Sequence, residues 1–596
     1  MQLSKSFSSM GAALILLGLL IISLSLVSCS PPGPVVTCTS GNSNCTVTNS
    51  YGAFPDRSIC RVASVAYPSN ETHLLEIVSN ASRRKQKMKA VTVYSHSIPK
   101  LSCPGGPAGE GLVISTGRMN RTVSVDAATR RMTVEAGMKL RALIDAAARF
   151  GLAVPHSPYW QGMTIGGLIG TGSHGSSVFG KGSAVHEYVV GVRLVVPTAE
   201  PVNGYYARVV ELGEGDTDLL AAKVSLGVLG VISQITLQLE PMFKRNITNR
   251  VEKDAGFENK IVSFGEATQH GDITWYPSMR RVVYRDDFRV PVTTPGKGEN
   301  DFTGFRPQVS LVITAARGLE VALEKTSNAG GKCVQSKLQV TTLLETGMGL
   351  KNNGGSLLEF TGYPVIGNQS AMQTSGSCLN GNDDLLFTAC GWDPRIVGLF
   401  YHQTTVSVAL SKASNFVADV KQLRDMFPDA LCGTELYSGF LMRYVRNSTA
   451  YLGKTEDSVD FDITYYRSRD PKEPRLYEDV LEEVEQMALF KYGGLPHWGK
   501  NRNVGFFGVR VKLGTKADRF VEAMRRFDPQ GLFSSEWTDG IFGLNGADLA
   551  IVKKGCALEG LCICSMDEHC APADGYYCRP GFVYPQARVC RKANDS

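Results

Sequence analysis

The chain has 596 residues, of which 43% are hydrophobic and 20% are charged. These proportions are those of a soluble globular protein, and they exclude a coiled coil, a globally disordered chain and a multi-span membrane protein. The net charge of +6 arises from 62 Lys+Arg and 56 Asp+Glu without a dense basic tract, so the composition does not indicate nucleic-acid binding.

The N-terminus predicts a secretory signal peptide over residues 1–29. Lys5 precedes an almost wholly apolar run from Gly11 to Val27, and small residues stand just before Pro31. The alternative is an uncleaved membrane anchor, but a run of about 17 residues is at the lower limit for a membrane span. We therefore expect a secreted chain without a stable membrane span, destined for the extracellular space, the cell wall or a vacuolar route.

Cysteines and sequons agree with export. Cleavage after Cys29 leaves 14 of the 15 cysteines, an even number that suits disulfide pairing. Asn-x-Ser/Thr sequons, the acceptor sites of N-glycosylation, occur at Asn44, Asn70, Asn80, Asn120, Asn246, Asn368, Asn447 and Asn594. The sequence predicts an extracellular, N-glycosylated protein.

Residues 30–56 predict a loop-like, disulfide-held leader, and residues 57–242 predict an α+β domain. The expected strands are Lys89–Tyr94, Leu112–Thr116, Thr122–Val125, Met132–Glu135, Val189–Val196 and Val231–Leu239. The clearest helix is Met138–Phe150, because its apolar residues recur on one face and Gly151 follows as a C-terminal cap. A shorter helix is expected near residues 218–225.

Residues 243–545 predict a second, larger α+β region. Its expected strands are Val282–Arg285, Ser310–Thr314 and Asp460–Tyr466. Apolar residues at helical spacing predict an amphipathic helix over Arg475–Tyr492.

Residues 546–596 predict a small Cys-rich module. Its six cysteines are Cys556, Cys562, Cys564, Cys570, Cys578 and Cys590. Such a density is typical of a disulfide-stapled module in an oxidising compartment. Zinc is the alternative, but the module lacks the paired Cys-x2-Cys spacing of a zinc ribbon. We expect disulfides and no metal site, and the spacing leaves the pairing open.

The segment Gly162–Ser177 is rich in glycine. Without Cβ atoms, its backbone N–H groups are free to face an anion such as a pyrophosphate. No Gly-Lys-Ser/Thr closes the segment, which excludes a Walker loop, and the strand–turn–helix frame of a Rossmann fingerprint is missing. By themselves these residues predict either a phosphate cradle or a structural turn.

Four motifs in chain order resemble the vanillyl-alcohol-oxidase type of FAD-binding domain. Tyr94–Ser97 is similar to its first pyrophosphate loop, and Val134–Gly137 to the lead into its helix. Gly166–Ser176 is similar to its second flavin segment, and Ser225–Ile232 to its strand entry near the flavin. The resemblance implies a two-subdomain FAD-binding domain, an α+β substrate domain and the disulfide-rich module. The implied FAD contacts are Tyr94, Ser95, His96, Ser97, Ile165, Gly166, Gly167, Gly170, Thr171, Gly172, His174, Gly175, Ser176, Val231 and Ile232.

Motifs in the second region resemble the aldonolactone oxidoreductases. Pro496–Lys500 is similar to their His-Trp-x-Lys motif, Arg443 stands at their substrate-side arginine, and Phe527–Phe533 matches their closing segment. The run Tyr159–Gly162, the secretory start and the Cys-rich tail resemble the plant L-gulonolactone oxidases. The resemblance implies an FAD-dependent oxidase of a sugar lactone. L-Gulono-1,4-lactone would be oxidised at C2 to give L-ascorbate, with O2 as acceptor and H2O2 as product.

The same resemblance implies roles for four residues. His96 aligns with the histidine that bonds covalently to the flavin 8α-methyl group; the alternative is a hydrogen-bonding loop residue. Arg443 would hold the lactone oxygens through its planar donor fork and stabilise developing negative charge, unless it forms a structural salt bridge. Lys500 would orient the substrate or face the flavin, and His497 is either a proton acceptor or a packed structural histidine.

Leu441 departs from the family pattern, because many aldonolactone enzymes have Glu two residues before the arginine. The carboxylate partner of Arg443 and the catalytic base are therefore left open; Glu435 is near in sequence, but nothing directs it inward. Counting back without gaps from Ile165–Gly167 places Pro158 at the family position near flavin C4a. In this family a proline there tends to admit O2, which favours an oxidase over a dehydrogenase.

Two alternatives stand: a related flavoenzyme of another sugar or alditol, and a cell-wall binding protein of low turnover. The oligomeric state is also left open.

Overall fold

The structure is a computed structural model that describes residues 36–47, 60–91, 99–106, 109–306, 310–353, 360–373, 401–468, 470 and 473–593. The predicted signal peptide, the first flavin loop (Tyr94–Ser97) and the sequon at Asn594 lie outside these residues. None of the described helices is long and apolar enough to cross a membrane.

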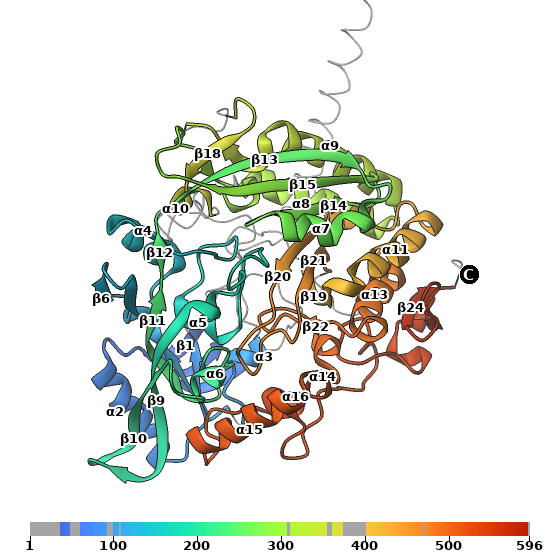
Figure 1. Ribbon diagram of the computed structural model, residues 1–596. Helices are drawn as coiled ribbons and strands as arrows, with labels where there is room; N and C mark the ends of the chain where they lie inside the picture. Colours follow the sequence, from blue (N-terminus) through green and yellow to red (C-terminus); the bar gives the residue numbers. More distant parts are fainter. Residues whose placement is uncertain are drawn as a thin grey trace, which may run out of the picture.

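Two five-stranded sheets form the N-terminal half (Figure 1). The first has the order β1 (Val36–Ser40), β2 (Ser43–Val47), β3 (Cys60–Ala66), β5 (Leu112–Ser115) and β4 (Met88–Val91). The second is antiparallel, with the order β10 (Tyr205–Gly213), β9 (Val189–Val202), β11 (Val231–Gln238), β7 (Arg131–Glu135) and β6 (Thr122–Asp126). Helix α2 (Glu71–Arg83) joins them, because Leu74 and Val78 share a core with residues of both sheets.

Helix α4 (Leu140–Arg149) lies within the predicted range, and its apolar stripe is buried. Gly151 follows it with φ +69°, a backbone conformation that glycine adopts without steric cost. The glycine-rich segment contains a short helix, α5 (Ile165–Gly170), that the sequence does not predict. The expected helix near residues 218–225 is the single turn α6 (Leu219–Ala222).

An eight-stranded sheet dominates the second half. Its order is β18 (Val365–Asn368), β13 (Lys244–Lys253), β15 (Arg281–Val290), β14 (Asp272–Tyr276), β20 (Phe440–Val445), β21 (Ser458–Tyr466), β19 (Tyr401–Ala409) and β22 (Leu495–Pro496). Its apolar face packs against α7 (Ile261–Ala267), α11 (Leu410–Met426) and α13 (Glu478–Gln486). Because strand side chains alternate between faces, Phe440 and Met442 enter this core and Arg443 lies on the opposite face.

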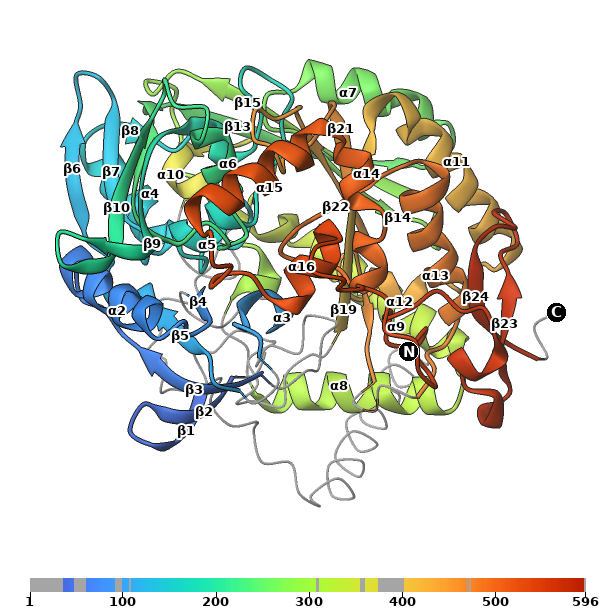
Figure 2. The same cartoon turned by 90° about the horizontal axis from the view of Figure 1, so that it is seen from below.

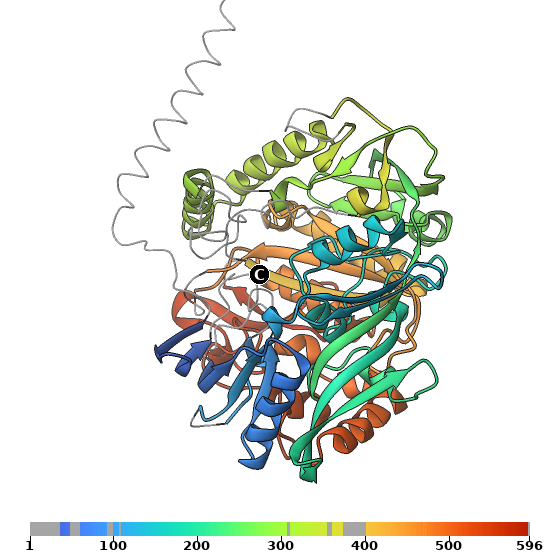
Figure 3. The same ribbon diagram turned by 90° about the vertical axis from the view of Figure 1, so that its left-hand side faces the viewer.

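One predicted strand is wrong. Residues 310–314 begin helix α8 (Ser310–Lys325), which is followed by α9 (Ala329–Glu345). The β-branched run favours a strand locally, but Ile313, Arg317 and Glu320 are buried at helical spacing, and this longer pattern decides the element. Figure 3 shows these helices, in yellow-green, and the blue first sheet at opposite ends of the molecule.

The C-terminal helices return to the N-terminal half (Figure 2). Helices α14 (Val509–Leu513), α15 (Thr515–Phe527) and α16 (Glu536–Phe542) pack into the core that contains α4 and β11. The backbone N–H of Met88 also donates to Leu532 O over 2.7 Å. The C-terminal helices therefore pack the two halves of the chain together.

The Cys-rich module has a hairpin of β23 (Tyr576–Pro580) and β24 (Arg588–Lys592). Its disulfides are Cys556–Cys562, Cys564–Cys578 and Cys570–Cys590. The expectation of disulfides is confirmed, and the fold selects one of the pairings that the sequence leaves open. Three further disulfides in the described residues are Cys38–Cys45, Cys60–Cys103 and Cys333–Cys432.

Candidate functional site

Buried charged side chains form a row across the polar face of the large sheet. Asp272, Arg443 and Asp460 are direct neighbours on β14, β20 and β21. The Arg443 guanidinium NH2 lies 2.9 Å from Asp460 Oδ2 and 3.1 Å from Asp462 Oδ2. Both aspartates share this face because the apolar residues between and beside them point into the opposite core. Arg443 is thus fixed by two carboxylates of the adjacent strand.

Electrostatics favour the ionised forms of Arg443, Asp460 and Asp462. Burial opposes the charge of Arg443, but the two carboxylates raise its pKa. Burial would raise the pKa of Asp460, but His174 and Arg443 hold it well below its usual value. Burial acts likewise on Asp462, whose pKa is lowered by Lys500 and Arg443. The two carboxylates therefore hold the charged guanidinium of Arg443 in a preorganised position. Such preorganised donors stabilise a developing anion.

The carboxylate that is missing at Leu441 is supplied across the sheet. Leu441 is the direct neighbour of Asp462 in the β20–β21 ladder, so the acidic group has moved one strand away. Glu435 does not take this role, because its Oε1 accepts the backbone N–H groups of Ser278 and Met279. Burial raises the pKa of Glu435 to about 8.

The predicted His-Trp-x-Lys motif lies against the same row. Strand β22 pairs with β19, and the chain then brings Lys500 Nζ to 2.6 Å from Asp462 Oδ2. Burial lowers the pKa of Lys500, and Asp462 opposes that shift. Burial, together with Lys500, holds the pKa of His497 well below its usual value, so this imidazole is neutral at pH 7. Trp498 anchors the segment by donating its indole N–H to Leu452 O over 2.7 Å.

The glycine-rich segment is hydrogen-bonded to the strand that carries Arg443. Ser177 N–H donates to Tyr444 O over 2.7 Å, and Ser176 Oγ accepts from Tyr444 N–H over 3.0 Å. His174 Nε2 lies 3.3 Å from Asp460 Oδ2, and its ring centroid is 5.5 Å from that of His497. The structure therefore brings together the predicted catalytic residues Arg443, Lys500 and His497 and the end of the predicted cofactor segment.

Three of the four flavin motifs meet in space. Gly166 N–H donates to Ala136 O over 2.8 Å, and Leu226 N–H donates to Gly170 O over 2.9 Å. Ile165 and Val231 are fully buried packing residues, whereas Gly167 is exposed. Gly166, Thr171 and Gly172 are half-buried, and their N–H groups donate to carbonyl oxygens within the protein. His96 and the rest of the fourth motif lie outside the described residues.

The cradle fits a pyrophosphate-bearing cofactor. The hydroxyls of Thr116 and Thr164 are buried and have no hydrogen-bond partner in the described part of the chain. A Cβ at Gly175 would lie 2.7 Å from Ser157 O, so only glycine allows this close approach. These two hydroxyls, together with the exposed Gly167 of α5, fit the oxygens of a phosphate group.

Asp460 and Asp462 are not predicted from the sequence as residues of the site. Neither are four further residues of the row, Tyr159, Asp272, Arg285 and Lys454. Tyr159 donates its hydroxyl to Asp272, and the Arg443 guanidinium lies 5.9 Å from the centroid of the Tyr159 ring. Arg285 lies 3.7 Å from Asp272 and continues the row. Burial lowers the pKa of Lys454, next to Asp460, to about 8. The available signal was the alternation in β21, where Asp460 and Asp462 lie between the core residues Val459, Phe461 and Ile463.

Comparisons with known proteins identify the family. The FAD binding domain family matches residues 62–204, the D-arabinono-1,4-lactone oxidase family residues 412–541, and the L-gulonolactone oxidase 2-like C-terminal domain family residues 553–592. L-Gulonolactone oxidase 2 of Arabidopsis thaliana is 54% identical over 95% of this chain and 94% of its own length. L-Gulonolactone oxidase 5 of the same plant is 52% identical over 98% of each chain. This chain belongs to the L-gulonolactone oxidase family.

Membership of the L-gulonolactone oxidase family makes the chain an FAD-dependent oxidoreductase. An L-gulono-1,4-lactone dehydrogenase of Mycobacterium tuberculosis is 24% identical over 83% of this chain and 99% of its own. Among solved structures, a solvent-stable cholesterol oxidase superposes with a TM-score of 0.64 at 15% identity, covering 86% of this chain and all of its own. The cholesterol oxidase of Brevibacterium sterolicum gives 0.61 at 13%, covering 87% and 100%. These likenesses confirm the expected fold class.

Proposed function

We propose that this family member oxidises L-gulono-1,4-lactone at its C2 hydroxyl, and that the 2-keto lactone enolises to L-ascorbate. The names of the plant relatives support the substrate. The observation that carries the chemistry is the buried Arg443, fixed between Asp460 and Asp462 beside Lys500 and the glycine-rich segment.

The chemistry that FAD would supply, when held by the glycine-rich segment, is acceptance of a hydride from C2 of the lactone and return of two electrons and two protons to O2 as H2O2. Arg443 Nε is buried and has no hydrogen-bond partner among the described residues, so it is a free donor for the C2 oxygen. The guanidinium would stabilise the negative charge that develops on this oxygen as its proton leaves. His497 is neutral, and its Nδ1 accepts the backbone N–H of Gly499 over 3.1 Å, so its Nε2 carries the proton. We therefore assign His497 a packing role beside His174, and solvent the acceptance of the C2 hydroxyl proton.

The charge balance of the row suits an uncharged substrate. Arg443 and Lys500 are both matched by carboxylates, and Arg285 by Asp272 and Asp287. A free sugar acid would bring a further anion into a site whose cations are already neutralised. A lactone instead offers hydroxyl groups that both bond carboxylates and accept from cations.

Export and glycosylation also belong to the proposal. The described part of the chain holds six disulfides, which form and persist in oxidising compartments. Six sequon asparagines of the described residues are exposed, namely Asn44, Asn70, Asn80, Asn120, Asn368 and Asn447. O2 as acceptor is supported by Pro158 at the position expected near flavin C4a.

The test begins with the visible spectrum of the purified protein under anaerobic conditions. We expect L-gulono-1,4-lactone to bleach the flavin, and air to restore the colour with formation of H2O2. Arg443→Ala should slow the bleaching at least 100-fold while FAD stays bound, with Arg443→Lys as the charge-conserving comparison. Bleaching by an alditol or another lactone alone would assign another substrate. Equal loss of FAD and of bleaching in Arg443→Ala would make this arginine structural.

A further inference from the structure

Helix α13 is buried on two sides. Val480 and Val484 pack into the core of the large sheet. Its opposite stripe consists of polar residues at helical spacing, and each of them bonds the Cys-rich module: Asp479, Glu482, Glu483 and Gln486. This stripe therefore faces the module and not solvent, although its composition is that of a solvated face.

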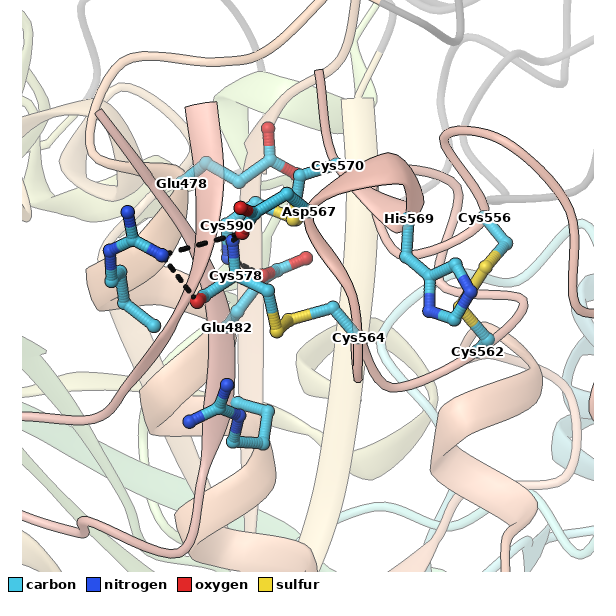
Figure 4. The surroundings of a disulfide bond; sticks show 12 residues. Glu478, Glu482, Cys556, Cys562, Cys564, Asp567, His569, Cys570, Cys578 and Cys590 are labelled. Atoms are coloured by element: carbon cyan, nitrogen blue, oxygen red, sulfur yellow. Dashed lines mark hydrogen bonds and ion pairs between the residues drawn. A yellow bond between two sulfur atoms is a disulfide. The ribbon is translucent and has the colours of Figure 1, made fainter. Parts of the chain in front are cut away.

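The acidic stripe fixes the module through its backbone. The Glu483 carboxylate accepts three consecutive N–H groups, from Phe582, Val583 and Tyr584, over 2.7, 2.6 and 2.7 Å. Glu482 accepts Cys590 N–H over 3.0 Å. Hydrogen bonds from backbone N–H groups to a carboxylate are charge-assisted and geometrically specific. The disulfides beside Glu482 hold the rest of the module rigid on this platform (Figure 4).

The first disulfide loop of the module, residues 556–562, reaches the segment that carries Lys500. Gly560 O accepts Val504 N–H over 3.1 Å. A Cβ at Gly560 would lie 2.4–2.6 Å from the Cβ, Cδ and Nε atoms of Arg502, so the loop packs directly on this side chain. Cys556–Cys562 closes this loop, and His569 lies beside it (Figure 4).

Arg502 connects the loop to the site. It is buried and forms an ion pair with Glu485, whose other oxygen accepts the Thr404 hydroxyl of β19 over 3.2 Å. Its neighbour Asn501 exchanges hydrogen bonds with the Thr405 backbone over 2.8 and 2.9 Å. The Thr405 hydroxyl in turn donates to Asp462 over 3.1 Å. Strand β19 holds one side of the segment, and the disulfide loop holds the other.

We infer that the Cys556–Cys562 loop is a positioning element for the active-site lysine. By seating Arg502 and Val504, it fixes the turn that places Lys500 Nζ on the Asp462 carboxylate. The catalytic importance of Lys500 rests on the proposed function, whereas the contacts of the loop with Arg502 and Val504 do not. The Cys-rich module thus supports the segment that carries Lys500, although it lies far in the sequence from every flavin motif.

Gly560→Ala tests this inference, with Gly575→Ala as the matched control. Both glycines belong to the module and have positive φ, +64° and +82°, but a Cβ at Gly575 meets nothing within 4 Å. In the FAD-loaded protein we expect Gly560→Ala to lower hydrogen-exchange protection of the Val504 and Lys500 amides at least tenfold. The control should leave both amides protected. In the pH profile of flavin bleaching by the lactone, we attribute the alkaline limb to loss of the charge on Lys500, and we expect this limb to shift only in Gly560→Ala.

Arg502→Lys provides a second variant should Gly560→Ala fail to fold, because it keeps the charge toward Glu485 and loses the packing under Gly560. Unchanged protection of both amides would overturn the inference. Loss of protection at Val504 alone, with Lys500 and the alkaline limb unchanged, would also overturn it and leave the loop a simple brace. Exchange requires no substrate, so a wild-type protein that the lactone does not bleach would refute the proposed function without affecting this test.

Discussion

Replacement of Asp462 by Asn would remove the carboxylate that lies between Arg443 and Lys500. The amide oxygen can still accept the hydrogen bonds of Gln403 and Thr405, so the local geometry is largely kept. At an effective dielectric constant of about 20, unit charges 2.6 Å apart attract by about 6 kcal/mol. About 1.4 kcal/mol corresponds to one pKa unit. Even if reorganisation absorbs most of the attraction, the pKa of Lys500 should fall by at least one unit.

The sign of the effect follows from the two influences on Lys500. Burial already lowers its pKa and Asp462 opposes that shift, so loss of Asp462 favours the uncharged amine at lower pH. The assay is the pH profile of flavin bleaching by lactone, whose alkaline limb should move to lower pH by at least one unit.

Asp254→Asn is the control for the loss of a buried ion pair. Asp254 is equally buried, pairs with Arg424 and accepts the Trp275 indole N–H, but it belongs to the apolar side of the large sheet. Each variant should lose about 3–5 kcal/mol of stability. An unmoved alkaline limb in Asp462→Asn would refute the requirement for a charged Lys500.

Three further predictions concern the cofactor and stability. His96→Ala should leave the protein folded but let acid extract the flavin, as judged by the colour of the precipitate; flavin that stays attached would exclude the covalent link through His96. In the His96→Ala background, Gly175→Ala should weaken FAD binding at least tenfold in a flavin titration, because its Cβ would meet Ser157 O, whereas Gly180→Ala meets nothing and serves as control. Burial raises the pKa of Glu435 from 4.5 to about 8, so its contribution to stability is lost as pH rises between these values. Glu435→Gln should therefore raise the melting temperature above pH 8 and leave it unchanged near pH 4.5; a gain that is equal at both values would contradict this linkage.

Local patterns predicted much of the fold. The alternation of β21 and the apolar stripe of α4 appear in the structure as expected, because periods of 2.0 and 3.6 residues are properties of neighbouring residues. The predicted strand at residues 310–314 is wrong for the same reason, since five residues are too few to separate a strand from the start of a 16-residue helix.

By itself, the sequence determined the flavin motifs, the His-Trp-x-Lys segment, Arg443 and the disulfide character of the tail, because each depends on residue types at short spacing. Only the tertiary structure decided which carboxylates hold Arg443. Asp460 and Asp462 reach it through the register of two strands that the motif does not include. The structure also turned the acidic stripe of α13 from an apparent solvent face into the platform of the Cys-rich module. Ion pairs and buried polar faces depend on which distant segments pack together, and that is set by the global burial of apolar surface and not by local spacing.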